Sequence, residues 1–193
     1  MVRNRQAEVV KNLSDRELLI NVYLTQGILL ILSCVIGVIL FSEVWFIDEI
    51  VEFNLGDMIF LGGGLALIVV LIDQLLMVVL PEDKLDDGGI NERIFSNLSI
   101  PHILFLSFVI SFSEELLFRG VIQTHLGLFI ASGLFAIIHV RYLAKPVLFT
   151  LVIGISFMLG ILFEFTDNVL VTITAHFLID STMGILIKQK AHS

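Results

Sequence analysis

Six stretches of the chain are dominated by apolar residues, and polar stretches separate them. The apolar runs cover about 19–41, 57–80, 101–124, 127–140, 146–164 and 168–188. A helix needs about 20 residues to cross the hydrocarbon core of a bilayer, and every run except the fourth comes near that length. The pattern predicts an all-α bundle of about six transmembrane helices, because open strands cannot satisfy their backbone groups in lipid.

Residues typical of turns and helix ends mark the boundaries of these runs. Ser14 and Glu17 have the spacing of a capping box ahead of the first run. Pro81 ends the second run, and Pro101 suits the first turn of the third. Gly127 is expected in the turn between the third and fourth helices. Glycines 62–64 predict close contact of the second helix with a neighbour.

The composition agrees with a membrane protein. Hydrophobic residues make up 57% of the 193 residues and charged residues 16%, whereas soluble domains have about 45–50% and about 25%. The mean hydropathy is +1.00. Residues 19–41 exceed the usual length of a signal peptide's apolar segment, so they are interpreted as the first span. We predict one transmembrane domain over 19–188, a lead-in over 1–18 and a tail over 189–193.

The basic residues predict the orientation of the bundle. All eleven Lys and Arg residues except Arg119 fall on one side of a six-span arrangement. Because cytoplasmic loops are enriched in Lys and Arg, both termini are predicted to be cytoplasmic, in a multi-pass protein of the cell membrane. The basic residues form no patch with interleaved aromatic residues, so a nucleic-acid partner is not expected.

Several ionisable residues fall inside the predicted spans. A charged side chain at the centre of a span costs at least about 2.5–3.5 kcal/mol on insertion scales. Such residues therefore usually face the bundle interior, a water-filled cavity or a partner. They are Asp73, Glu114, Glu115, Arg119, His139, His176 and Asp180.

The third span carries two adjacent carboxylates and an arginine. Glu115 and Arg119 are four residues apart, so they share a helical face and can form an ion pair. Glu114 points about 100° away, which leaves it available as a general base. The alternative is a structural ion pair that locks two helices. Asp73 is a further candidate, either facing the same cavity or pairing with Arg119.

Two later spans add histidines. His139 ends the fourth span, and His176 and Asp180 share one face of the sixth. The carboxylate can fix the imidazole tautomer, or both can converge on one ligand or oxyanion. A helix-locking hydrogen bond is the alternative. Together these groups suit hydrolysis. They would also suit Zn²⁺, since one Glu and two His can ligate it, although no His-Glu-x-x-His motif is present.

At these positions the sequence resembles the CAAX protease and bacteriocin-processing family of intramembrane proteases (CPBP, or Abi). That family's pattern is Glu-Glu-x-x-x-Arg, then Phe-x-x-x-His, then His-x-x-x-Asn or Asp. The resemblance covers about residues 100–188, the motif-bearing core, while the first two spans match as generic hydrophobic helices. The matching residues follow in the same order: Glu114-Glu115 with Arg119, Phe135 with His139, and His176 with Asp180.

The resemblance implies an intramembrane endopeptidase, similar to the type II CAAX prenyl endopeptidases, that acts on a membrane-associated protein or peptide. By this resemblance Glu114 activates a water molecule, supported by Glu115 and Arg119. His139 assists with the water or with a metal. Members are called metalloproteases, and a divalent metal such as Zn would involve Glu114, His139 and His176. A glutamate-activated water without metal is the other possibility.

The remaining motif residues and the size of the chain refine this expectation. His176 and Asp180 are expected to hold the oxyanion or to complete the site. Asp180 replaces the Asn of many members, and a carboxylate is a poorer oxyanion donor unless it is protonated. The small size and short loops resemble bacterial members, for which prenylated CAAX substrates are not expected.

Two other classes of function compete with the enzyme. A non-catalytic membrane partner, such as an immunity protein that kept the fold, should tolerate Glu114→Gln, whereas an enzyme should not. A proton-coupled transporter would also place Asp, Glu and His in the membrane. Against the transporter, the six short spans show no inverted repeat and no paired broken helices.

Overall fold

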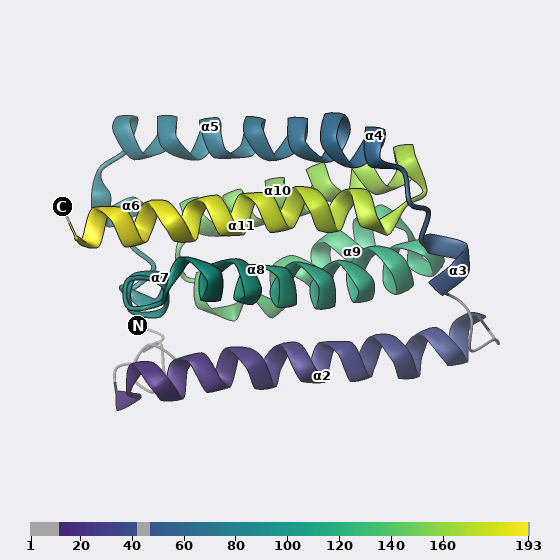
Figure 1. Ribbon diagram of the computed structural model, residues 1–193, viewed down its shortest axis with the longest axis horizontal. Helices are drawn as coiled ribbons and strands as arrows, with labels where there is room; N and C mark the ends of the chain where they lie inside the picture. Colours follow the sequence, from purple (N-terminus) through teal and green to yellow (C-terminus); the bar gives the residue numbers. More distant parts are fainter. Residues whose placement is uncertain (1–11, 42–46, 193) are drawn as a thin grey trace.

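The computed structural model describes residues 12–41 and 47–192 (Figure 1). The described residues form helices and connecting loops, without a β-strand, so the predicted all-α class is confirmed. The described residues do not include 1–11, which make up most of the predicted lead-in. They also do not include Glu43 in the loop after the first span. α11 continues to Ala191, so the predicted tail begins as helix.

Within residues 12–41 and 47–192, five helical runs are long and apolar enough to cross a membrane. Each predicted span falls on one of them, with ends shifted by a few residues. They are α2 (Asp15–Phe41), α4 to α5 (Leu55–Val79), α8 to α9 (Ile100–Ile138), α10 (Pro146–Thr166) and α11 (Val169–Ala191). The second run joins α4 (Leu55–Asp57), the π-helix η1 (Met58–Gly62) and α5 (Gly63–Val79). Short helices fill the connections: α3 (Ile47–Ile50), α6 (Glu82–Leu85), α7 (Ile90–Phe95) and η3 (Val140–Tyr142).

The predicted capping box begins α2. The backbone amide of Ser14 donates to Glu17 Oε2 (2.7 Å), and the amide of Glu17 donates to Ser14 Oγ (3.3 Å). Two donors that have no partner inside the helix are thereby satisfied. The first span therefore starts where the local sequence predicts.

The run Ile100–Ile138 is a helical hairpin rather than one long helix. It consists of α8 (Ile100–Glu115), the π-helix η2 (Leu116–Gln123) and α9 (Thr124–Ile138). At Gly127 the backbone leaves the helical region, with φ 79° and ψ 168°. After this residue α9 folds back along η2 (Figure 1). The Phe118 and Phe135 rings lie 5.1 Å apart. The hairpin supplies the third and fourth of the six predicted passes, and the fourth ends at Ile138.

The two ends of the described chain lie at the same end of the bundle (Figure 1), which we call the termini end. Asp15 pairs there with Arg93 (2.9 Å), and Lys188 donates to the carbonyl of Ser96 (3.2 Å). An even number of passes accounts for this arrangement. The cytoplasmic location of this end remains a prediction.

α11 occupies the centre of the bundle, with α5 on one side and α8 on the other (Figure 1). Gly62 allows a close approach to α11, because a Cβ at this position would lie 2.8 Å from the carbonyl oxygen of Val171. The predicted glycine contact is therefore made by the first residue of 62–64. α2 packs on α8 and η2 at the edge of the bundle.

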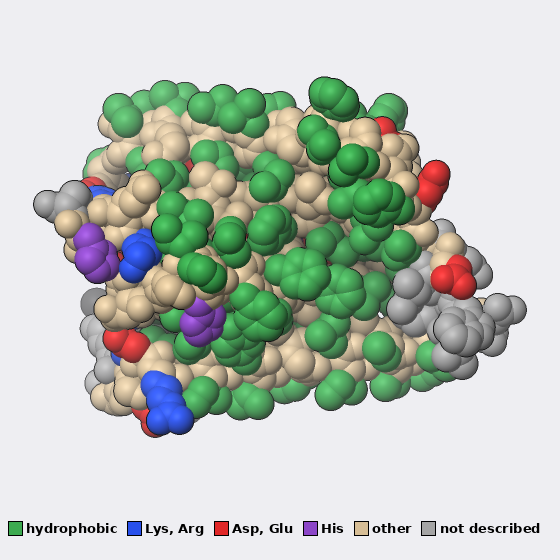
Figure 2. Space-filling model, in the orientation of Figure 1, with side chains coloured by type: hydrophobic (Ala, Val, Ile, Leu, Met, Phe, Trp, Pro, Cys, Tyr) green, Lys and Arg blue, Asp and Glu red, His purple; other side chains and the backbone are tan. Residues whose placement is uncertain are grey.

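The surface matches a bilayer environment. Many large apolar side chains of the spanning helices are exposed, such as Ile31 at 64% and Val78 at 85%. Figure 2 shows apolar side chains across the middle of one face, with charged residues toward the two ends. Lipid can solvate this apolar belt at no cost, whereas water cannot. The protein is therefore an integral membrane protein.

Candidate active site

The two adjacent glutamates lie where α8 gives way to the π-helix η2. Glu114 is 6% exposed, and Glu115 and Arg119 are fully buried. The π-helix spans eight residues and begins immediately after Glu115. Such π segments are rare and frequently occur at functional sites, because they shift side chains relative to a regular helix. The pattern of residues along the chain does not indicate this irregularity.

Glu115 is held by two cationic or hydrogen-bonding partners. Its Oε2 lies 3.2 Å from Nε of Arg119, so the predicted pair four residues apart is present. Its Oε1 lies 2.9 Å from Nδ1 of His176 on α11. Nε2 of the same imidazole lies 3.5 Å from Oδ2 of Asp180. Arg119, Glu115, His176 and Asp180 therefore contact one another in that order. These contacts join the end of α8 and the following η2 to α11.

The imidazole of His176 lies between two carboxylates. A carboxylate oxygen accepts hydrogen bonds, so the ring satisfies both neighbours when both nitrogens carry protons. Asp180 is the more open of the two acids, with a side chain 28% exposed against 0% for Glu115. Both ring nitrogens of His176 therefore face carboxylate oxygens in this structure.

Arg119 has further contacts that the sequence did not indicate. Its Nη2 donates to Oγ of Ser156 on α10 (3.2 Å), and its guanidinium carbon lies 5.2 Å from the centroid of the Phe135 ring. Ser156 is fully buried. The sequence does not show which residue a serine in an apolar helix will contact, because helix packing decides which neighbour that side of the helix meets.

Phe135 connects the two histidines. Its ring centroid lies 4.7 Å from that of His139 and 6.2 Å from that of His176. Nδ1 of His139 is 2.7 Å from the carbonyl oxygen of Phe135. Because a carbonyl can only accept, this hydrogen bond requires the proton on Nδ1. The described residues give His139 no hydrogen bond or ion pair to either glutamate.

Glu114 faces a different helix from Glu115. Its Oε1 accepts a hydrogen bond of 3.1 Å from Nε2 of Gln26 on α2, and the Gln26 carbonyl oxygen accepts one from the Ser113 hydroxyl. No hydrogen bond from the described residues reaches Oε2 of Glu114. Sequence reasoning missed Gln26, although a glutamine inside a 23-residue apolar run is the kind of residue that needs a buried partner.

A known protein family covers the segment of the chain that carries these residues. The model of the family described as "Type II CAAX prenyl endopeptidase Rce1-like" matches residues 96–182, which include all seven motif residues. The chain is also 45% identical over 167 residues to YpbD of Bacillus subtilis (strain 168), described as an uncharacterized protein. That alignment covers 86% of this chain and 87% of YpbD. The chain belongs to the Rce1-like family. No solved structure matches it.

The loop after His139 is tied to the loop between α5 and α8 at the termini end. Arg141 lies 3.7 Å from Asp87, and Lys145 lies 3.2 Å from Asp86. Tyr142 is buried beneath the guanidinium of Arg141 (4.5 Å) and stacks parallel to His139, with centroids 6.2 Å apart. Burial raises the pKa of Tyr142, so it is a neutral phenol beside this histidine at neutral pH.

The sequence also left open a metal site formed by Glu114, His139 and His176. Within the described part of the chain, no three His, Cys, Asp or Glu side chains come together in a group that could hold a metal ion. Glu114 contacts Gln26, while His176 contacts Glu115 and Asp180, so the three predicted ligands are not directed at one point. In this structure Glu114, His139 and His176 therefore do not form a metal-binding group.

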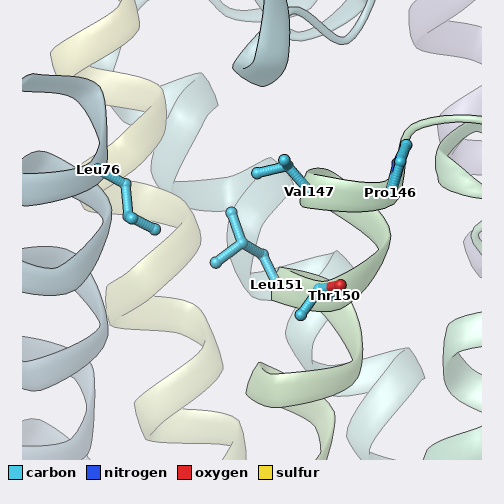
Figure 3. Close-up of a pocket in the computed structure, with 5 residues that line it drawn as sticks. All are labelled: Leu76, Pro146, Val147, Thr150 and Leu151. Atoms are coloured by element: carbon cyan, nitrogen blue, oxygen red, sulfur yellow. The ribbon is translucent and has the colours of Figure 1, made fainter. Parts of the chain in front are cut away.

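Two remaining expectations concern Asp73 and the cavity. Arg119 pairs with Glu115, and Asp73 on α5 receives a hydrogen bond of 3.4 Å from its neighbour Gln74, so the proposed Asp73–Arg119 pair is not formed. A pocket of about 350 Å³ lies between α5 and α10 (Figure 3). No motif residue lines it. Its lining is Leu76, Pro146, Val147, Thr150 and Leu151.

Proposed function

We propose that this Rce1-like protein is an intramembrane endopeptidase that hydrolyses a peptide bond of a membrane-associated substrate. The observation that supports this most is the unequal bonding of its two adjacent carboxylates. Oε1 of Glu115 contacts Nδ1 of His176 at hydrogen-bond distance and Oε2 forms an ion pair with Arg119, whereas Glu114 has one hydrogen bond, from Gln26, and no ion pair among the described residues. Glu115 is therefore the fixed partner and Glu114 the available base.

In the proposed reaction Glu114 takes a proton from a water molecule, and the water oxygen attacks the carbonyl carbon of the scissile bond. Glu114 then returns the proton to the leaving amine as the C–N bond breaks. The products are a new carboxyl end and a new amine, and the carboxylate is regenerated. A base of this kind contributes about 10²- to 10⁴-fold to the rate.

The other motif residues have supporting roles in this proposal. His139 presents Nε2 to the attacking water, because its Nδ1 proton is committed to the Phe135 carbonyl. Arg119 and His176 hold Glu115 in place, and Asp180 contacts the other ring nitrogen of His176 and orients the imidazole. Buried partners of this kind fix a reacting group without movement during the reaction.

The experiment compares cleavage of membrane-anchored peptides, with and without a prenyl group, by purified wild type, Glu114→Gln and Glu164→Gln. Glu164 is an exposed carboxylate on α10 and serves as the matched control. We expect Glu114→Gln to lower the rate about 10²- to 10⁴-fold and Glu164→Gln to leave it unchanged.

Three outcomes would count against parts of the proposal. Full activity of Glu114→Gln would refute the role of this base. A wild-type protein that cleaves no peptide would favour a non-catalytic membrane partner. Loss of activity in chelator with recovery in Zn²⁺ would establish a metal requirement, and would mean that the motif side chains rearrange around the ion.

A further inference from the structure

α2 buries a glutamine against the candidate base, although this helix precedes the residues that match the family model. Gln26 is 5% exposed, while most apolar side chains of α2 face outward. Burying an amide without a hydrogen-bonding partner costs about 1–3 kcal/mol in proteins. The partners that Gln26 finds in the bundle therefore decide what it does there.

The amide of Gln26 lies in a short chain of three groups. Its Nε2 donates to Glu114 Oε1 (3.1 Å), and its Oε1 accepts from the hydroxyl of Ser113. Oγ of Ser113 also lies 2.8 Å from the carbonyl oxygen of Val109. A hydroxyl has one proton and can donate it to either acceptor. Ser113 can therefore serve Gln26 as a donor or as an acceptor.

The hydrogen-bonded groups of Gln26 and Ser113 can provide a partner for the Glu114 carboxyl group with or without a proton. The carboxylate accepts from the amide NH₂, while Ser113 donates to the amide oxygen. After Glu114 takes a proton, the carboxyl donates to the amide oxygen of the rotated Gln26. The amide NH₂ then donates to Ser113, whose hydroxyl proton turns to Val109. Each of these donors keeps an acceptor in both arrangements, which an apolar residue at position 26 could not provide.

We infer that Gln26 is a positioning residue that keeps Glu114 in place in both protonation states of the catalytic cycle. This inference rests on the proposed function, because a general base must accept a proton and later return it. Rotation of one amide by half a turn accompanies each transfer. The candidate site is then completed by a helix that the family motifs do not include.

A second buried glutamine, Gln123, provides a comparison that distinguishes a positioning role of Gln26 from simple helix packing. Polar side chains commonly join helices in membranes. Gln123 does so, because it is 4% exposed and its Nε2 donates to the carbonyl of Gly160 (2.7 Å). Gln123 has no hydrogen bond to an ionisable side chain among the described residues. If Gln26 is only a packing contact, replacing either glutamine should have the same kind of effect.

The test measures kcat and KM for Gln26→Met and Gln123→Met on a peptide that wild type cleaves. Misplacing a catalytic group by about 1 Å can cost about 100-fold, so we expect Gln26→Met to lower kcat by about 10- to 100-fold with KM nearly unchanged. Gln123→Met should keep the wild-type kcat. Equal kcat values for the two variants would overturn the inference.

Infrared spectra give a readout that does not depend on cleavage. Carboxyl stretching bands that disappear in Glu114→Gln belong to Glu114, and they should shift in Gln26→Met and stay in place in Gln123→Met. Ser113→Ala removes one group of the same chain and serves if Gln26→Met does not fold. It should shift the same bands and lower kcat, with no further loss in the double variant.

The two proposals fail in different ways. Wild-type cleavage with an unshifted Glu114 band in Gln26→Met would overturn the role of Gln26 and leave the endopeptidase standing. Absence of wild-type cleavage would overturn the endopeptidase and with it the catalytic purpose of Gln26. A shifted band in that case would show that the hydrogen bond exists as a packing contact.

Discussion

Replacing Arg119 by methionine tests the buried ion pair without reference to activity. Arg119 and Glu115 are both 0% exposed, and their contact is 3.2 Å. Removing one partner of a buried pair costs about 3–5 kcal/mol, because it leaves an uncompensated charge. Since His176 still contacts Glu115 at 2.9 Å, the loss should lie toward the lower end of that range.

The assay is thermal unfolding in a fixed detergent, followed by circular dichroism. For a chain of this size, about 3–5 kcal/mol corresponds to a fall in Tm of roughly 6–20 °C. The control is Arg93→Met, because Arg93 forms a 2.9 Å pair with Asp15 in which the side chains are 31% and 49% exposed. Exposed pairs contribute about 0–1 kcal/mol.

The double variant Glu115→Gln/Arg119→Met separates the charge effect from lost packing. It removes both charges, so it should be more stable than Arg119→Met alone if the unpaired Glu115 carboxylate causes the loss. An Arg119→Met protein with a Tm close to that of Arg93→Met would refute the reasoning. It would mean that water or another cation reaches Glu115.

Two further predictions concern stability. Gly127→Ala should destabilise the protein by about 1 kcal/mol or more, because φ is 79° at this position. The control Gly133→Ala lies in a helix with open space at its Cβ, so it should not destabilise the protein. Equal Tm values for the two variants would contradict this prediction. The Gly88 amide, with help from Lys145, lowers the pKa of Asp86. The ionised Asp86 carboxylate should therefore stabilise the folded protein fully above the unfolded pKa of about 3.9. This contribution should be lost as pH falls through the pKa of Asp86 in the folded protein. Unfolding of Asp86→Asn against pH should lack that component, and an unchanged acid limb would refute it.

Much of the fold follows from local patterns along the chain. The capping box at Ser14, the turn at Gly127 and the pairing of Glu115 with Arg119 each depend on residues a few positions apart. The periodicity of a helix fixes such neighbours before any packing occurs. The lengths of five of the apolar runs likewise match the thickness of the bilayer, and the placement of the Lys and Arg residues supports the shorter fourth run as a further pass.

Partners between helices could not be predicted in the same way. The pattern of apolar residues shows which side of a soluble helix is buried, but lipid is as apolar as the protein interior, so a membrane helix lacks that signal. His176 contacts Glu115 rather than Glu114, and Arg119 finds Ser156. The same reason explains why Gln26 could not be connected to Glu114 in advance.

The sequence by itself determined where the long apolar helices lie and which ionisable residues they carry inside the membrane. The tertiary structure decided how the two adjacent glutamates differ: α11 and η2 enclose Glu115, and α2 supplies one hydrogen bond to Glu114. The physical reason is that covalent spacing sets the direction of each side chain on its own helix, whereas the partner it meets depends on the packing of helices far apart in sequence.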